Sequence, residues 1–183
     1  FQEAIFTYLT GFGDNESDEV KLAKKRLKNE KNILNAKSYF PKKLKTECRI
    51  IEYLCEFEND YLGALMLIGE QQLLIMCQSL QSKLFNDVLQ RTMDERINID
   101  KSSLPLLGYN STFSSGRIGE LEREVLKTND LELKDFFIIQ LPYLSLRCSS
   151  RKAFFKVREL DIEIKDDEEF KISKKIILIF ILD

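Results

Sequence analysis

Leu73-Leu-Ile-Met-Cys-Gln-Ser-Leu-Gln-Ser-Lys-Leu-Phe-Asn-Asp-Val88 carries the strongest secondary-structure signal in the sequence. Its apolar side chains recur every three or four residues, the spacing that places side chains on one face of an α-helix. The recurring positions are Leu73, Cys77, Leu80, Leu84 and Val88. This pattern predicts one long helix between Glu70 and Arg96, with the apolar stripe buried in a core.

Shorter helical patterns precede this long one. The first covers residues 1–10 and stops at Gly11-Phe-Gly13. The second is capped by Asn15 or Ser17, and its acidic residues precede its basic ones in the order that suits a helix dipole. The expected buried positions are Val20, Ala23 and Leu27 in the second helix, and Leu44, Cys48, Ile51 and Cys55 in a third. Residues 1–97 are therefore predicted to be helical.

The pattern changes after residue 97. A short helix is expected over residues 120–127, and runs of β-branched or aromatic residues predict strands. The predicted strands cover residues 136–141, 152–157, 159–165 and 176–182. Helices followed by strands indicate an α+β fold, in which an N-terminal helical part is followed by a mixed part that ends in antiparallel strands.

The composition limits the chemistry that this chain can perform. Its 183 residues include no histidine and no tryptophan, and its four cysteines form no C-x-x-C pair. Histidine-dependent triads, histidine general bases and histidine metal sites are therefore excluded, and carboxylate, lysine, tyrosine or cysteine chemistry remains. We expect no metal, no cofactor and four reduced thiols.

The apolar runs and the two ends of the sequence indicate where the protein is located and whether it is part of a longer one. The longest apolar run, residues 176–182, is far shorter than the ~20 residues of a membrane-spanning helix. No signal-peptide pattern opens the chain, so a cytoplasmic protein without a membrane partner is expected. The chain starts without Met and stops directly after an apolar strand, which predicts a fragment of a longer protein.

Positive charge is concentrated in one segment. Residues 20–45 contain ten Lys or Arg and one acid, a local charge of +9 in a chain whose net charge is −2. Such a segment can bind nucleic acid by neutralising phosphates, although a solvated helix face has the same composition. The candidate RNA contacts are Lys24, Lys25, Arg26, Lys42 and Lys43, together with Arg147, Arg151 and Lys152 after an expected strand and loop.

Two further patterns have a functional and a plainer interpretation. Gly116-Arg-Ile-Gly119 is similar to the GXXG loop of KH domains, but polar residues precede it and a plain turn is favoured. Asp166-Asp-Glu-Glu169 could form a metal or acid–base cluster, but consecutive acids in a turn point in different directions. We interpret this second pattern as a solvated turn.

Four short motifs follow one another along the chain. They are Gln81-Ser-Lys-Leu-Phe-Asn86, Leu104-Pro-Leu-Leu-Gly-Tyr109, Gly119-Glu-Leu-Glu-Arg-Glu124, and Leu144-Ser-Leu-Arg147 with Arg151. In this order they resemble the TruD family of tRNA pseudouridine synthases, and the opening Ala4-Ile-Phe-Thr-Tyr-Leu-Thr-Gly11 is similar to its archaeal-type members. Within the first motif, the positions that match the family are Gln81, Ser82, Phe85 and Asn86, whereas Lys83 stands where an aromatic residue is usual.

The resemblance implies an enzyme that isomerises a uridine of tRNA to pseudouridine, usually at position thirteen, with a catalytic aspartate and no cofactor. The target base would have to leave its stack to be reached. The aspartate belongs to a Gly-x-Lys-Asp stretch that nothing in this chain matches, so no catalytic residue is assigned and the chain alone is predicted to be inactive. Cys148 replaces a glycine after Arg147, which predicts a remodelled loop before Arg151.

The resemblance also implies a domain organisation. Residues 1–148 would form the inserted domain of the family, helical over 1–97 and mixed over 98–148, and residues 149–183 would be strands that return to an incomplete catalytic core. The chain would then contribute mainly the RNA-embracing part of the enzyme. The residues by themselves leave two alternatives open, a non-catalytic RNA-binding module and a helical protein-interaction domain.

Overall fold

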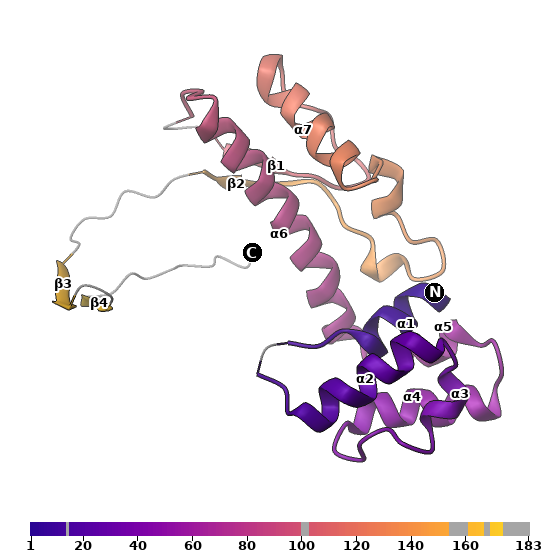
Figure 1. Ribbon diagram of the computed structural model, residues 1–183. Coiled ribbons are helices and arrows are strands. Elements are labelled where there is room, and N and C mark those ends of the chain that lie inside the picture. Colours follow the sequence, from indigo (N-terminus) through magenta and orange to yellow (C-terminus); the bar gives the residue numbers. More distant parts are fainter. Residues whose placement is uncertain (14, 100–102, 154–160, 167–168, 174–183) are drawn as a thin grey trace. The chain divides into compact units, whose positions relative to one another are not determined.

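The computed structural model describes residues 1–13, 15–99, 103–153, 161–166 and 169–173 (Figure 1). These residues form two compact units. The first unit comprises residues 1–80 and 140–144, and the second comprises residues 81–139 and those from 145 onward. The long helix α6 (Glu70–Asp94) runs from the first unit into the second.

The first unit is a cluster of short helices. They are α1 (Gln2–Thr10), α2 (Asp18–Glu30), α3 (Ile33–Ala36), α4 (Lys45–Glu56) and α5 (Tyr61–Met66). α1 packs against α2 and α5, and α4 packs against α3 and α5. The predicted first and second helices are confirmed, and the predicted side of α2, formed by Val20, Ala23 and Leu27, is buried.

The predicted third helix exists as α4, but its buried face differs from the predicted stripe. Ile51 is buried as expected, whereas Cys48 is half-buried and Cys55 is exposed. Successive residues lie about 100° apart around a helix, so a stripe through residue 51 can continue to residue 54 or to residue 55. The structure takes Leu54 into the core, beside Ile50. The prediction that Cys55 is a core thiol is therefore wrong.

The long predicted helix is confirmed as α6. Its stripe is buried at Leu73, Leu84 and Val88 and half-buried at Cys77 and Leu80. The two half-buried positions are the ones nearest to the point where the helix passes from the first unit into the second. The stripe therefore serves two cores, one at each end of the helix.

The second unit is built around the C-terminal half of α6. It contains β1 (Ser103–Leu106), α7 (Gly116–Thr128), the 3-10 helix η1 (Leu133–Phe136) and β2 (Ser149–Lys152). β1 and β2 pair antiparallel, with Leu104 opposite Arg151. The other 3-10 helix, η2 (Pro142–Leu144), belongs to the first unit.

Polar contacts join α6 to α7 in antiparallel order. Lys83 donates a hydrogen bond to Asn129 near the C-terminal end of α7, at 2.6 Å, and Arg91 pairs with Glu124 at 3.4 Å. Near the N-terminal end of α7, Arg117 bonds Glu95 at 2.6 Å. These contacts are exposed, so each adds little stability and the buried side chains Leu121, Val125 and Leu126 hold α7 in place.

α7 begins four residues earlier than predicted. Gly116 to Gly119 form its first turn, so they are neither a KH-type loop nor a separate turn. Gly119 is instead needed for a close approach, because a Cβ at position 119 would collide with the backbone of Ser114. Only glycine allows the preceding loop to fold back this tightly on the helix.

The strand predictions are confirmed in part. Residues 136–141 form no strand, because Leu133 to Phe136 are a 3-10 helix and the chain then turns toward Pro142. β2 ends at Lys152, so it shares only that residue with the strand expected over 152–157; Ala153 is not in a strand, and residues 154–157 lie outside the described residues. β3 (Asp161–Asp166) confirms most of the strand expected over 159–165. β4 (Glu169–Ser173) pairs with β3, with Asp166 opposite Glu169 at the predicted turn. The strand expected over 176–182 lies outside the described residues. The α+β fold class is confirmed.

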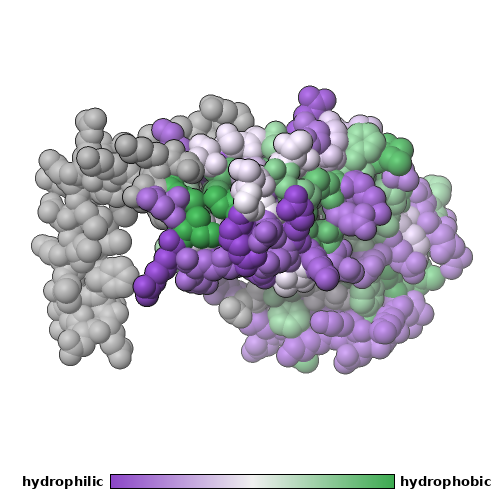
Figure 2. Space-filling model, turned by 90° about the horizontal axis from the view of Figure 1, so that it is seen from above, coloured by the Kyte–Doolittle hydropathy of each residue, from purple (hydrophilic) through white to green (hydrophobic). Residues whose placement is uncertain are grey.

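The visible face in Figure 2 is mostly hydrophilic, with hydrophobic residues gathered in small groups among polar ones. No helix in the described ranges is both long enough and apolar enough to pass through a lipid bilayer.

Candidate nucleic-acid interface

Gln81 of α6 ties two segments of the second unit together. Its side-chain amide, which is buried, donates to the carbonyl oxygens of Leu107 at 2.9 Å and Arg147 at 3.0 Å. Each amide hydrogen thus has an acceptor, as a buried polar group requires. This residue of the first family motif therefore holds the second and fourth motifs beside each other.

Gly108 makes this close approach possible. A Cβ at this position would collide with the backbone of residues 146–148. The next residue continues the contact, because the Tyr109 N–H donates to the Leu146 carbonyl at 3.0 Å. Any side chain at position 108 would separate the segments that Gln81 joins.

Cys148 adopts an ordinary backbone conformation. Positive φ angles at described non-glycine residues occur only at Lys31, Asn59, Arg96 and Asp130. The Cys148 N–H donates to the Asn110 side-chain oxygen at 2.7 Å, which fixes the start of the loop. Cys148 therefore needs no glycine-only conformation, and the predicted remodelling of the loop before Arg151 stays a prediction.

Arg147, Arg151 and Lys152 lie within one short segment, in which Arg151 and Lys152 are consecutive residues of β2 and therefore point to opposite faces of the strand. Arg147 is exposed, and its Nε donates to the Tyr109 hydroxyl at 2.9 Å. The Arg151 guanidinium lies 5.4 Å from the centre of the Phe85 ring, and Lys152 is exposed at the end of β2. Three positive charges within six residues suit a phosphate backbone.

The remaining residues of the first motif play different parts. Phe85 is buried under Arg151, Ser82 is half-buried and Asn86 is exposed. Two of the four motif residues, Gln81 and Phe85, thus have a structural role, because they hold other segments in position. The fourth, Asn86, is accessible on the surface of α6.

Glu122 is a residue that the sequence patterns did not single out. Its carboxylate is fully buried, and it accepts hydrogen bonds from the Ser114 backbone N–H at 2.8 Å and the Ser114 hydroxyl at 2.6 Å. A buried carboxylate is costly unless it is bonded in this way. Glu122 thereby anchors the loop that connects β1 to α7. Its place inside the third motif was the available signal.

Lys24, a predicted RNA contact, is buried in the first unit. Its ammonium group donates to the Gly11 carbonyl at 2.8 Å and to the Glu16 carboxylate at 2.7 Å. Only 4% of its side chain is exposed, so its charge is not presented to a ligand. The apolar spacing of α2 explains this, because position 24 follows Val20 by one helical turn and lies on the buried face.

The other predicted contacts in the first unit are exposed. Arg26 bonds Glu30 at 2.6 Å and stacks on Tyr39, and Lys43 bonds Glu19 at 2.8 Å. Lys25 lies 5.7 Å from the centre of the Phe12 ring, and Lys42 is exposed. Exposed ion pairs are weak, so the Lys or Arg of such a pair can release its carboxylate partner and bind a phosphate instead. Their role in binding RNA stays a prediction.

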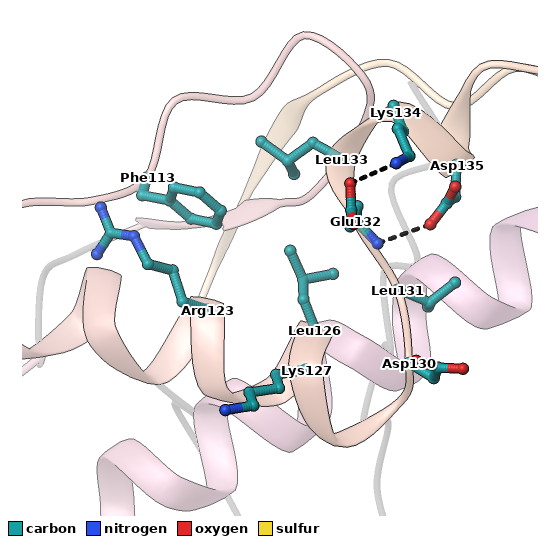
Figure 3. Close-up of a pocket in the computed structure, with 10 residues that line it drawn as sticks. All are labelled: Phe113, Arg123, Leu126, Lys127, Asp130, Leu131, Glu132, Leu133, Lys134 and Asp135. Atoms are coloured by element: carbon teal, nitrogen blue, oxygen red, sulfur yellow. Dashed lines mark hydrogen bonds and ion pairs between the residues drawn. The ribbon is translucent and has the colours of Figure 1, made fainter.

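A hollow of about 520 Å³ lies beside α7 (Figure 3). Phe113 and Leu126 are among the residues that line it, and the Arg123 guanidinium lies 4.4 Å from the centre of the Phe113 ring. On the facing segment, Glu132 pairs with Lys134 at 2.7 Å, and its N–H donates to Asp135. Charges of both signs line this hollow, so it lacks the positive excess that a phosphate requires.

In the part of the chain that the structure describes, no three acidic, cysteine or histidine side chains gather as a metal site would require. The buried hydrogen bonds of Gln81 and Glu122 instead fix the loops that carry Arg147, Tyr109 and Phe113.

Comparison with known proteins identifies the family. A family model described as tRNA pseudouridine synthase D (TruD) matches residues 1–103 and 101–183, which together span the chain. The chain belongs to the TruD family. The resemblance carried by the four motifs is thereby confirmed.

Relatives of the TruD family match over much of this chain. "Probable tRNA pseudouridine synthase D" of Methanopyrus kandleri is 28% identical over 185 residues, which cover 94% of this chain and 46% of the relative. "Probable tRNA pseudouridine synthase D 1" of Methanocaldococcus jannaschii is 32% identical over 155 residues, which cover 80% of this chain and 38% of the relative. The chain spans about half the length of the curated relatives that it matches.

The fold is shared with a solved structure. The crystal structure of a tRNA pseudouridine synthase D (TruD) from Methanosarcina mazei superposes with a TM-score of 0.79 at 21% identity. The match covers 92% of this chain and 48% of that protein. The arrangement of helices and strands described above is therefore a TruD fold.

Proposed function

We propose that this chain is part of a tRNA pseudouridine synthase, which isomerises a uridine of tRNA, at position thirteen, to pseudouridine. The observation that carries the proposal is the match of the TruD family model along the whole chain. Several relatives also bear the name of this enzyme. A cytoplasmic location and tRNA as the partner follow from the same function.

The contribution of this chain is to hold the RNA. Arg147, Arg151 and Lys152 of the second unit contact phosphates, and the exposed cations Lys25, Arg26, Lys42 and Lys43 of the first unit make phosphate contacts of their own. Lys24 has no part in this contact, since its ammonium group is buried and paired with Glu16. The reaction needs no metal and no cofactor.

The domain assignment is part of the same proposal. Residues 1–148 form the inserted domain of the family, and residues 149–183 return to the catalytic core. The two parts share one sheet at this boundary, because Ser103 to Leu106 of β1 pair with Ser149 to Lys152 of β2.

Binding of tRNA tests the proposal against the alternatives. We expect the chain to retain tRNA on a filter at low salt and to release it as salt rises, since phosphate contacts release counterions on binding. A helical protein-interaction domain would bind no tRNA under either condition. Absence of binding at low salt by the folded chain would exclude the proposed role.

Isomerase activity separates the enzyme from a non-catalytic RNA-binding module. We predict that this chain alone releases no tritium from tRNA labelled at C5 of uridine, because it has no Gly-x-Lys-Asp stretch to supply the aspartate. The longer protein that includes such a stretch should release it. Turnover by this chain alone would disprove the catalytic assignment, and inactivity of the longer protein would favour a non-catalytic module.

A further inference from the structure

Two aromatic rings meet at the surface of the second unit, next to Arg147. The centres of the Tyr109 and Phe137 rings lie 5.1 Å apart, with the ring planes at 64°. This edge-to-face contact leaves Phe137 47% exposed. A phenylalanine ring that a neighbouring ring supports, and that water still reaches, is available as a stacking surface.

The backbone holds both rings in a fixed position. The Leu146 N–H donates to the Phe136 carbonyl at 2.9 Å, and the Leu146 carbonyl accepts from the Tyr109 N–H at 3.0 Å. The Ile138 N–H donates to the Ser145 hydroxyl at 2.9 Å. Three segments are thus bonded side by side, and the side chains of Phe136 and Leu146 are buried. The aromatic pair is organised before any ligand arrives.

Arg147 adds a positive charge to this surface. Its Nε is bound to the Tyr109 hydroxyl, which leaves the terminal guanidinium nitrogens able to donate to another group. No carboxylate in the described part of the chain forms an ion pair with Arg147. A fixed guanidinium beside an exposed ring matches a nucleotide, which presents a flat base and a phosphate together.

We propose that Phe137, supported by Tyr109, is a stacking subsite for an unpaired nucleobase of the bound RNA, with Arg147 on the adjoining phosphate. This inference rests on the proposed function, because it assumes that RNA reaches this surface. Every base has a π-face, so the subsite selects single-stranded RNA over duplex RNA and does not select one sequence. Its occupant is a nucleobase that has already left its helix.

Substitution of the ring tests the subsite. Phe137→Leu keeps an apolar side chain of similar size and removes the π-face, so we expect affinity for a short oligouridine to fall roughly fivefold or more. Affinity for a duplex RNA of the same length should stay the same. Ile139→Leu is the matched control, because Ile139 lies two residues away, is 73% exposed and is aliphatic. The control should leave both affinities unchanged.

A tryptophan at this position gives a second readout that does not depend on affinity. The chain has no tryptophan, so Phe137→Trp places a single indole at the subsite. Oligouridine should quench its fluorescence by stacking, whereas the duplex RNA should not. This variant keeps a large aromatic ring, so it carries the test if Phe137→Leu fails to fold by circular dichroism.

The outcomes separate the subsite from the proposed function. If the chain binds both RNAs, and Phe137→Leu binds oligouridine as tightly as Ile139→Leu does, the subsite is wrong and RNA binding stands. The subsite is also wrong if oligouridine and duplex RNA quench the fluorescence of Phe137→Trp equally, or if neither RNA quenches it. If the unchanged chain binds none of the oligouridine, the duplex RNA and tRNA, the proposed function fails and the subsite fails with it.

Discussion

At the scale of single residues, Lys24 joins the end of α1 to α2. Its ammonium group bonds a carbonyl and a carboxylate in a nearly buried position, so Lys24→Met removes one donor from two acceptors. We expect this change to lower the free energy of unfolding by about 1 to 3 kcal/mol, the usual cost of leaving such groups unpaired. Urea unfolding followed by circular dichroism measures it.

The control for Lys24 lies one turn further along the same helix. Lys28 is exposed, so Lys28→Met should change the free energy of unfolding by no more than about 0.5 kcal/mol. Equal losses in the two variants would mean that Lys24 is no more buried than Lys28. Both variants replace Lys by Met in the same helix, so the small change in helix propensity is the same in each and cancels when the two free energies of unfolding are compared.

The cysteines provide a second test at this scale. Cys55 is exposed, whereas Cys77 is half-buried and burial raises the pKa of its thiol. The thiolate is the reactive species, so a raised pKa lowers its fraction near pH 7 and slows the reaction. We predict that iodoacetamide modifies Cys55 before Cys77, as peptide mass spectrometry over a time course would show. Modification of Cys77 before Cys55 would contradict the exposed position of Cys55 on α4.

Residue types could be predicted from the sequence better than their surroundings. The excess of positive charge between residues 20 and 45 is a fact of the sequence, but whether each charge is exposed depends on the helix face that carries it. Lys24 falls on the buried face with Val20 and Leu27, whereas Lys28 does not. Glu122 shows the same limit, because its partner Ser114 comes from a loop whose path no local pattern specifies.

At the scale of elements, α6 is the main support of the second unit. Leu84 is fully buried on it, so Leu84→Ala removes a large apolar side chain and leaves a cavity. The expected loss is about 2 to 5 kcal/mol in the free energy of unfolding. Ile75→Ala on the same helix is the matched control, because Ile75 is 59% exposed and should lose much less. A loss below about 1 kcal/mol for Leu84→Ala would mean that this face is not a core.

Helices were predictable where their periodicity is strong. α1, α2 and α6 follow clear apolar stripes, and their existence and approximate limits are confirmed. The register of α4 was not predictable, because apolar residues at positions 50, 51, 54 and 55 allow two faces and tertiary packing selects one. The run at residues 136–139 has strand-like residues, but its backbone bonds a loop and a serine side chain instead of a neighbouring strand.

At the scale of the whole molecule, family membership carries information that periodicity does not. Residues far apart in sequence, such as Gln81, Leu107 and Arg147, form one hydrogen-bonded cluster, and three of the four motifs contribute to it. Each motif is too short to be specific alone. Their order along the chain indicated the TruD family, whereas the contacts that unite them became visible only in three dimensions.

The salt dependence of tRNA binding is the measurement closest to the proposed role of this chain. Each phosphate contact contributes about 0.7 to 0.9 to the slope of log affinity against log salt. The triple variant Arg147→Gln, Arg151→Gln and Lys152→Gln should bind tRNA more weakly, with a slope reduced by roughly 2 to 3 if all three cations contact phosphates. An unchanged affinity and slope in a variant that folds normally would contradict the assignment of this surface to RNA.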